Sequence, residues 1–285
     1  MITYHNCSEV DISLAYRAFT VGFSDYIVKM DLSQDLFISR FFGAEGNQLE
    51  YSYIAMDEDK PIGLILGGLK RYEGVLTMRC GTLAVHPDYR GTGVSSKLFE
   101  LHKANALACE CKQLFLEVIV GNNRAIQFYK KLGYRKVYDL RYYTLHQPLR
   151  LTERKVEGLV IKPIAFDSFE HYVQNLRIEH INWQNDLDYM KRSENNTYAA
   201  AYLDDMIIGT VCMSDSGKVS FLYVDAGYRH QRIAASMLAK LVEEKQPERL
   251  SISFPNNHQL EGFLRSQRFE RNQLEQFEMY CFCEC

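Results

Sequence analysis

The stretch from Leu83 to Ser96, LAVHPDYRGTGVSS, constrains the fold more than any other part of the chain. An apolar strand leads through a turn at Pro87 into a glycine-rich loop, and apolar residues then recur at helical spacing. Glycines without a Cβ let backbone N–H groups approach a ligand closely, and the start of a helix adds partial positive charge. Phosphate oxygens are therefore the ligand atoms that this loop is suited to bind.

A second segment, Leu116 to Tyr134, reads LEVIVGNNRAIQFYKKLGY and predicts a strand, a Gly–Asn turn and a helix. Together the two segments resemble the GNAT superfamily of acyl-CoA-dependent N-acyltransferases. The phosphate loop of that family reads Arg/Gln-x-x-Gly-x-Gly/Ala, and here it stands as Arg90 to Ser95, with Ser95 in place of the last Gly or Ala. The second segment matches the strand-Asn-helix-Tyr-x-x-x-Gly-aromatic pattern of the family.

The resemblance implies an α/β (α+β) fold, in which helices flank a mixed central sheet. It also implies acetyl-CoA as co-substrate and no metal. The residues implied in donor binding are Leu83, Val85, Arg90, Gly91, Thr92, Gly93, Val94, Ser95, Ser96 and Asn122. Val85 is expected to offer its main-chain N–H and C=O to the pantetheine amides, which requires its strand to diverge from the strand at 114–120.

The chain contains this pattern twice. A shift of 139 positions places Leu83 on Leu222 and Tyr89-Arg90 on Tyr228-Arg229. A second strand and helix follow, so we expect two GNAT-like domains. We predict domains at 1–147 and 159–285, separated by a linker at 148–158 that contains Pro148 and a charged run.

The second copy is degenerate. His230 and Arg232 replace the two loop glycines, and by motif order Leu264 replaces Tyr129. A side chain then stands where backbone amides would meet phosphate, so we expect acetyl-CoA to bind the first domain alone. Arg232 offers a guanidinium as another way to hold phosphate. We interpret this copy as a domain that shapes the substrate cleft or a homodimer interface.

Composition narrows the class of protein. With 285 residues, 47% of them hydrophobic, and a net charge of −3, the chain resembles a globular enzyme and has no basic footprint for nucleic acid or anionic lipid. The apolar run from Pro61 to Leu69 is too short to span a bilayer. No secretory signal precedes Cys7, so we expect a cytoplasmic protein whose eight cysteines are reduced. Their Cys-x-Cys spacing is atypical of zinc sites.

Two residues are the candidates for catalysis. Tyr129 matches the general acid of the family, because a phenol that is protonated at pH 7 can donate to a leaving thiolate. The alternative is that the Phe128-Tyr129 pair only packs in the core. Glu117 lies in an otherwise apolar strand, where burial should raise its pKa and suit it as the base. The alternative is an ion-pair partner, for example of Arg124.

We therefore expect an N-acetyltransferase that moves an acetyl group from acetyl-CoA to a primary amine by direct attack. The acceptor is a small molecule or a peptide, and its identity does not follow from these residues. A second hypothesis is a non-catalytic acetyl-CoA-binding sensor. Product formation from labelled acetyl-CoA would separate the two.

Overall fold

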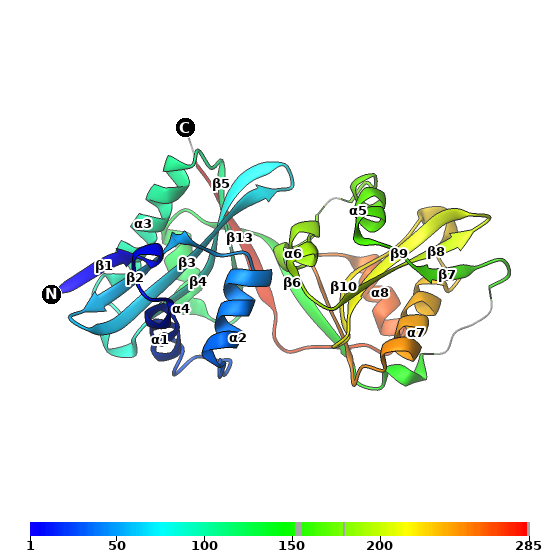
Figure 1. Ribbon diagram of the computed structural model, residues 1–285, viewed down its shortest axis with the longest axis horizontal. Helices are drawn as coiled ribbons and strands as arrows, with labels where there is room; N and C mark the ends of the chain where they lie inside the picture. Colours follow the sequence, from blue (N-terminus) through cyan, green and yellow to red (C-terminus); the bar gives the residue numbers. More distant parts are fainter. Residues whose placement is uncertain (152–155, 179, 284–285) are drawn as a thin grey trace. The chain divides into compact units, whose positions relative to one another are not determined.

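The computed structural model describes residues 1–151, 156–178 and 180–283. The chain forms two compact units (Figure 1). Unit 1 consists of Met1–Val137 together with Phe277–Cys285, and unit 2 consists of Tyr138–Gln276.

Unit 1 is a sheet in the order β1-β2-β3-β4-β5-β13 with helices on both faces. Its strands are β1 (Ile2–Asn6), β2 (Gln48–Asp57), β3 (Lys60–Tyr72), β4 (Val75–Val85), β5 (Gln113–Ile119) and β13 (Gln276–Phe282). Its helices are α1 (Ile12–Gly22), α2 (Gln34–Ile38), which continues into a π-helical segment (Ser39–Ala44), α3 (Val94–Ala108) and α4 (Asn123–Lys131). The pairings from β1 to β4 are antiparallel, whereas β4 and β5 are parallel.

Unit 2 repeats this plan in the order β6-β11-β10-β9-β8-β7, with β12 paired to β6. Its strands are β6 (Arg135–Leu145), β7 (Val160–Pro163), β8 (Asn196–Leu203), β9 (Met206–Ser214), β10 (Lys218–Val224), β11 (Leu250–Phe254) and β12 (Glu270–Arg271). Its helices are α5 (Phe166–Gln174), α6 (Leu187–Arg192), α7 (Ile233–Lys245) and α8 (His258–Ser266). The expected fold class, two mixed sheets flanked by helices, is thereby confirmed.

The two units do not follow the order of the sequence. The last strand of the chain, β13, lies beside β5 in unit 1, while β6 pairs with β11 in unit 2, with Leu145 opposite Leu250. The division of the chain into these two units therefore differs from the predicted linker at 148–158. Residues 152–155 of that linker lie outside the described residues. An unpaired edge at β5 would leave backbone groups without partners, and β13 covers it.

Two predicted elements differ in detail. The helical region expected at 167–190 is two helices, α5 and α6, with a 3₁₀ turn at Trp183–Asn185 between them, and residue 179 lies outside the described residues. The helix expected from Leu260 begins earlier, at His258, because the Asn257 side chain accepts a hydrogen bond from the Leu260 N–H and caps it.

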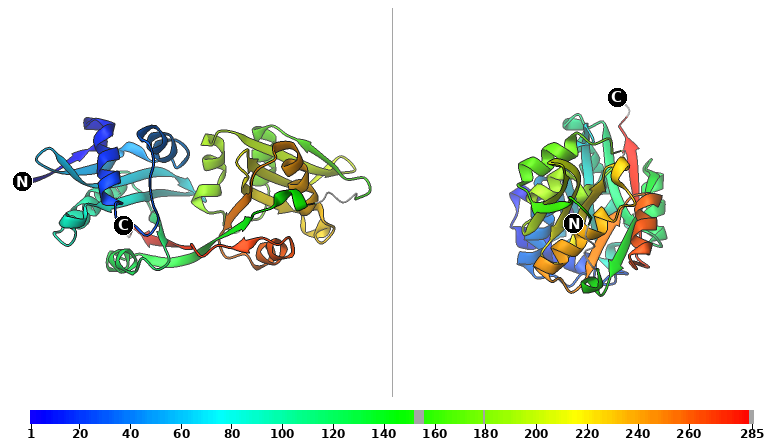
Figure 2. Two further views of the ribbon diagram at one scale, coloured as in Figure 1. Left: turned by 90° about the horizontal axis from the view of Figure 1, so that it is seen from below. Right: turned by 90° about the vertical axis from the view of Figure 1, so that its right-hand side faces the viewer.

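Separate apolar clusters hold the helices to the two faces of the unit 1 sheet (Figure 2, left). Phe19, Phe37 and Phe41 pack α1, α2 and the segment after it against one face. Leu98 and Phe99 of α3 join Tyr129 of α4 on the other face. The apolar stripes of the helices are buried in this way, and burial of such side chains is the main source of stability.

In both units, the parallel strand pair at the centre separates along its length. The β4–β5 pairing runs from Thr77 opposite Gln113 to Cys80 opposite Leu116 and stops there. A bulge at this level leaves Gly81 without a partner on β3. A Cβ at Gly81 would come within 2.1 Å of Asn47 Oδ1, so only glycine fits. The pairing of β10 and β11 ends likewise at Val219 opposite Ile252.

Candidate active site

The glycine-rich loop leaves β4 where the two parallel strands have separated. Gly91 and Gly93 have φ angles of 82° and 96°, in the left-handed region that favours glycine. No atom lies within 4 Å of a Cβ built on either residue, so the loop is open to a ligand. Gly93 caps α3, and the N–H groups of the first turn have no carbonyl one turn earlier to bond to. This gives the predicted phosphate loop its donors.

The other loop residues have structural contacts that hold this geometry. The Thr92 hydroxyl donates to Tyr89 O at 2.7 Å, and Val94 is buried in the core cluster beside α3. Ser95 is half-buried and Ser96 is exposed, both in the first turn of the helix. Their position is compatible with contact to an anion at the helix start.

Arg90 contacts protein groups. Its Nη atoms each lie 2.6 Å from an oxygen of Asp25, and Nη2 also donates to Gly22 O at the end of α1. The Arg90 side-chain hydrogen bonds lower the pKa of Asp25. Arg90 therefore fixes the loop against α1 through a bidentate ion pair with Asp25. Bidentate arginine–carboxylate pairs are among the stronger hydrogen-bonded contacts in proteins.

Some main-chain groups of β4 beyond the bulge already form hydrogen bonds within the protein. Val85 O accepts a hydrogen bond from Arg90 Nε at 3.0 Å, whereas we expected it to serve the pantetheine arm. Leu83 pairs with Ile65 of β3, on the strand segment that no longer pairs with β5. The expected divergence of the two strands is thus present.

Tyr129 lies in α4 and is almost completely buried, with 8% of its surface exposed. Cys80, at the end of the β4–β5 pairing, belongs to the same buried cluster. Burial raises the pKa of Tyr129 well above its ordinary value, and the neighbouring Cys80 adds to this. The phenol stays protonated across the physiological range and is a proton donor at the point where the strands separate.

Asn122 ends the turn after β5 and caps α4, since its Oδ1 accepts from the Ala125 N–H at 3.2 Å. Burial raises the pKa of Tyr26, in the segment between α1 and α2, and the Asn122 side chain offsets part of this rise. The α1–α2 segment therefore reaches the edge of the candidate site.

Glu117 is the first residue of β5 beyond the paired segment. Its side chain is 1% exposed, and Oε2 accepts from Arg79 Nη2 at 2.6 Å and from Nε at 3.1 Å. Arg79 is 3% exposed and also lies 3.4 Å from Glu45 Oε2. The ion-pair partner of Glu117 is therefore Arg79 of the adjacent strand, and not Arg124. The second oxygen, Oε1, is buried and has no hydrogen-bond partner among the described residues.

Sequence reasoning missed two residues that shape this site, Arg79 and Cys80. An arginine inside an apolar strand is a usable signal, because a buried charge requires a partner. The role of Cys80 carried no such signal, since a buried thiol is common in cores. In the described part of the chain, no group of three or more His, Cys, Asp or Glu residues is arranged to hold a metal ion.

Unit 2 keeps the backbone of the loop but not its residues. His230 and Arg232 have φ angles of 63° and 67°, the same left-handed conformation as the glycines that they replace. Arg229 Nε donates to Val224 O at 2.9 Å, as Arg90 does to Val85. Leu264, in place of Tyr129, is fully buried. Unit 2 therefore has no phenol at the position that corresponds to Tyr129.

The fold and the site define an acyltransferase of two related units, and comparison with known proteins agrees. Residues 16–134 match the model of the acetyltransferase (GNAT) family, and residues 167–279 match a second acetyltransferase (GNAT) domain model. The chain belongs to the GNAT family of acetyltransferases and is of its tandem, two-domain type.

Similar proteins include N-alpha-acetyltransferase 30 of Schizosaccharomyces pombe, 30% identical over 124 residues, which cover 41% of this chain and 79% of that protein. The N-alpha-acetyltransferase 30 of Saccharomyces cerevisiae is 30% identical over 41% of this chain and 70% of its own length.

Solved structures show the tandem fold along the whole chain. A tandem GNAT protein from the clavulanic acid biosynthesis pathway has a TM-score of 0.74 at 14% identity, covering 100% of this chain and 99% of that chain. A GCN5-related N-acetyltransferase from Sphaerobacter thermophilus has a TM-score of 0.69 at 13% identity, covering 99% and 95%. Within the described residues of our chain, none of the helices is both long and apolar enough to cross a lipid bilayer.

Proposed function

We propose that unit 1 transfers an acetyl group from acetyl-CoA to a primary amine by direct attack. The observation that carries this proposal is the neutral hydroxyl of Tyr129, next to Cys80 at the level where β4 and β5 separate. The open loop at Gly91 and Gly93 supports it, because phosphates of the donor would meet backbone amides there. Donor and proton source would then both lie near the point where β4 and β5 separate.

The thioester supplies an activated acetyl carbon. In the transfer, the amine nitrogen bonds to this carbon, the C–S bond breaks, and the sulfur takes up a proton. Tyr129 gives that proton, and the resulting phenolate is reprotonated from solvent after the product thiol leaves.

The amine must lose a proton before or during attack. Glu117 is our candidate for receiving it, through Oε1, directly or by way of one water. Its other oxygen stays bonded to Arg79, which fixes the orientation of the carboxylate. If solvent takes the proton instead, Glu117 serves only to balance Arg79 in the core.

A peptide α-amine is the acceptor class that the relatives favour, because the curated proteins at 30% identity are named N-alpha-acetyltransferases. We do not extend the proposal to a particular peptide sequence.

The test is a transfer assay with radiolabelled acetyl-CoA and three acceptor types: a peptide with a free α-amine, the same peptide with a blocked α-amine and one lysine, and small primary amines. Label in the first peptide, and not in the blocked one, is the expected result. Binding of acetyl-CoA without label transfer to any acceptor would instead favour a sensor.

A further inference from the structure

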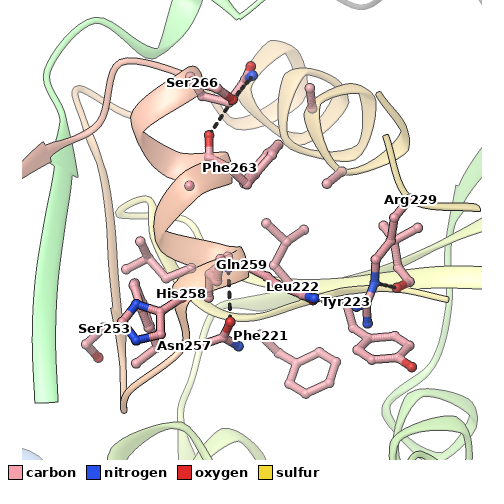
Figure 3. Close-up of a pocket in the computed structure, with 18 of the residues that line it drawn as sticks. Phe221, Leu222, Tyr223, Arg229, Ser253, Asn257, His258, Gln259, Phe263 and Ser266 are labelled. Atoms are coloured by element: carbon pink, nitrogen blue, oxygen red, sulfur yellow. Dashed lines mark hydrogen bonds between the residues drawn. The ribbon is translucent and has the colours of Figure 1, made fainter. Parts of the chain in front are cut away.

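Unit 2 contains a cleft of about 2060 Å³ at the position where β10 and β11 separate. Figure 3 shows Phe221 and Tyr223 of β10 on one side and Asn257 and His258 at the start of α8 on the other. All of its lining residues belong to unit 2. The cleft is separate from the residues to which we assign acetyl transfer, which all lie in unit 1.

The charge of this cleft is opposite to that of the chain. The net charge of the protein is −3, yet the described residues lining the cleft include four arginines and four histidines against one carboxylate, Glu270. A cleft lined by side chains of one charge sign attracts ions of the opposite charge. A cationic cleft in an acidic protein points to an anionic ligand.

One end of the cleft has the geometry for phosphate. The loop residues His230 and Arg232 keep the left-handed backbone at the start of α7, a helix of 13 residues. Both side chains are exposed and have no hydrogen bond or ion pair with the described residues. Arg229, by contrast, is held by Val224 O and by Gln259 Oε1 at 2.6 Å. Arg232 is thus a guanidinium available to a ligand, and guanidinium–phosphate pairs are among the stronger hydrogen-bonded pairs.

Elsewhere in the lining, two buried amides have unused hydrogen-bonding atoms. Asn182 and Asn185 are 1% and 2% exposed and both line the cleft. Asn185 Nδ2 donates to Asn182 Oδ1 and to Ser253 O, at 3.0 and 2.7 Å. This leaves Asn182 Nδ2, a donor, and Asn185 Oδ1, an acceptor, without partners among the described residues. Buried polar groups rarely lack a hydrogen-bond partner. A ligand with a hydroxyl or amide group would bond to the Asn182 donor and the Asn185 acceptor.

We propose that this cleft binds an organic phosphate, with its phosphate at Arg232 and the start of α7 and a polar group at Asn182 and Asn185. No transfer follows binding, because the buried Leu264 occupies the place of Tyr129 and supplies no proton. This proposal takes up the alternative left open by the sequence, in which the Arg232 guanidinium holds phosphate where the backbone amides do not. The side chain of Arg232 replaces that contact.

The probes are inorganic pyrophosphate and ADP, titrated by calorimetry into the full chain carrying Gly93→Glu, so that the loop of unit 1 does not contribute. We expect one equivalent of ADP per chain, bound more tightly than pyrophosphate, which has no ribose or base to satisfy Asn182 and Asn185. Arg232→Gly should raise the Kd of ADP roughly tenfold to a hundredfold, as loss of a hydrogen-bonded charge does. This variant keeps the backbone conformation, since glycine favours it.

The matched control is Arg249→Gly, an exposed arginine of unit 2 that does not line the cleft. It should leave the Kd unchanged. Absence of binding by both probes, or an equal Kd for ADP in the Arg232→Gly and parent proteins, would overturn the proposal. Equal affinities for pyrophosphate and ADP would overturn the part assigned to Asn182 and Asn185.

Discussion

Arg79 Nη2 and Glu117 Oε2 lie 2.6 Å apart in the interior of unit 1, with 3% and 1% of their side chains exposed. The pair joins β4 to β5 at the level where the two strands stop pairing. Because each charge is removed from water, neither tolerates the loss of the other. The carboxylate that we consider as a base is therefore also a structural ion.

Glu117→Gln should destabilise the protein by about 3 kcal/mol, since it takes the carboxylate at 2.6 Å away from the buried Arg79 cation. Equilibrium unfolding in urea measures this loss. Glu100→Gln, which removes an exposed ion pair with Lys97, is the control and should cost less than about 1 kcal/mol.

The same variant tests the role of Glu117 in proton transfer. If Glu117 accepts the amine proton, kcat/KM of Glu117→Gln is low at neutral pH and recovers at high pH, where free amine is available. A pH–rate profile with the same shape as that of the parent would leave Glu117 as a partner of Arg79 alone.

Gly93→Glu should raise the KM for acetyl-CoA at least roughly a hundredfold, because a carboxylate at the start of α3 repels the donor phosphates. Gly74 offers a matched control: its φ of 83° is also left-handed and its Cβ position is also open, but it lies in the β3–β4 turn. Gly74→Glu carries the same strain and charge, so an equal rise in KM there would argue against a phosphate loop.

Stability at acid pH should depend on His102. This side chain is fully buried in α3, and burial lowers its pKa to about 4. The unfolded chain binds the proton with an ordinary pKa of about 6.5, so stability is fully present above that pH. It falls as the pH drops from about 6.5 to about 4, by about 3 kcal/mol in total.

His102→Leu should remove this part of the pH dependence, measured as unfolding free energy between pH 7 and pH 4. The exposed His171 of α5 serves as the control. If His171→Leu flattened the curve as much as His102→Leu, burial would not be the cause.

The strand order can be tested by hydrogen exchange. Met279 of β13 is fully buried in the core cluster of α3 and α4, whereas Phe282 of the same strand is 71% exposed. Met279→Ala should cost about 2–5 kcal/mol and reduce amide protection in β5, more than 150 residues earlier in the sequence. Protection in β10 of unit 2 should persist. Phe282→Ala should change neither strand, and loss of protection in β10 alone would contradict the assignment of β13 to unit 1.

Local patterns predicted most of the first unit well. The apolar residues at helical spacing after the glycine-rich loop form α3 (Val94–Ala108), and Gly93 caps its start in the left-handed conformation. The pairing partners of β6 and β13 were not predictable in this way. Two related sheets each accept such a strand, so local residues do not specify which sheet it joins, and the choice depends on contacts distant in sequence.

In the candidate site, too, contacts between residues distant in sequence could not be predicted from local patterns. Glu117 stood out as a charge in an apolar strand, but its partner Arg79 is brought near only by the parallel pairing of β4 with β5. The loop of unit 2 is a different case. Loss of both glycines predicted a changed loop, yet the elements around it hold His230 and Arg232 in the left-handed region at a cost of roughly 1–2 kcal/mol each.

The most direct test of the account is single-turnover acetyl transfer by Tyr129→Phe, with Cys80→Ser as a comparison. The substitution removes only the hydroxyl, so acetyl-CoA affinity should change little, while the rate of the chemical step falls roughly tenfold to ten-thousandfold. Cys80→Ser changes a buried neighbour of Tyr129 but leaves its hydroxyl in place, so this variant should retain most of the activity. An unchanged single-turnover rate in Tyr129→Phe would show that the leaving thiolate takes its proton elsewhere and would contradict the proposed mechanism.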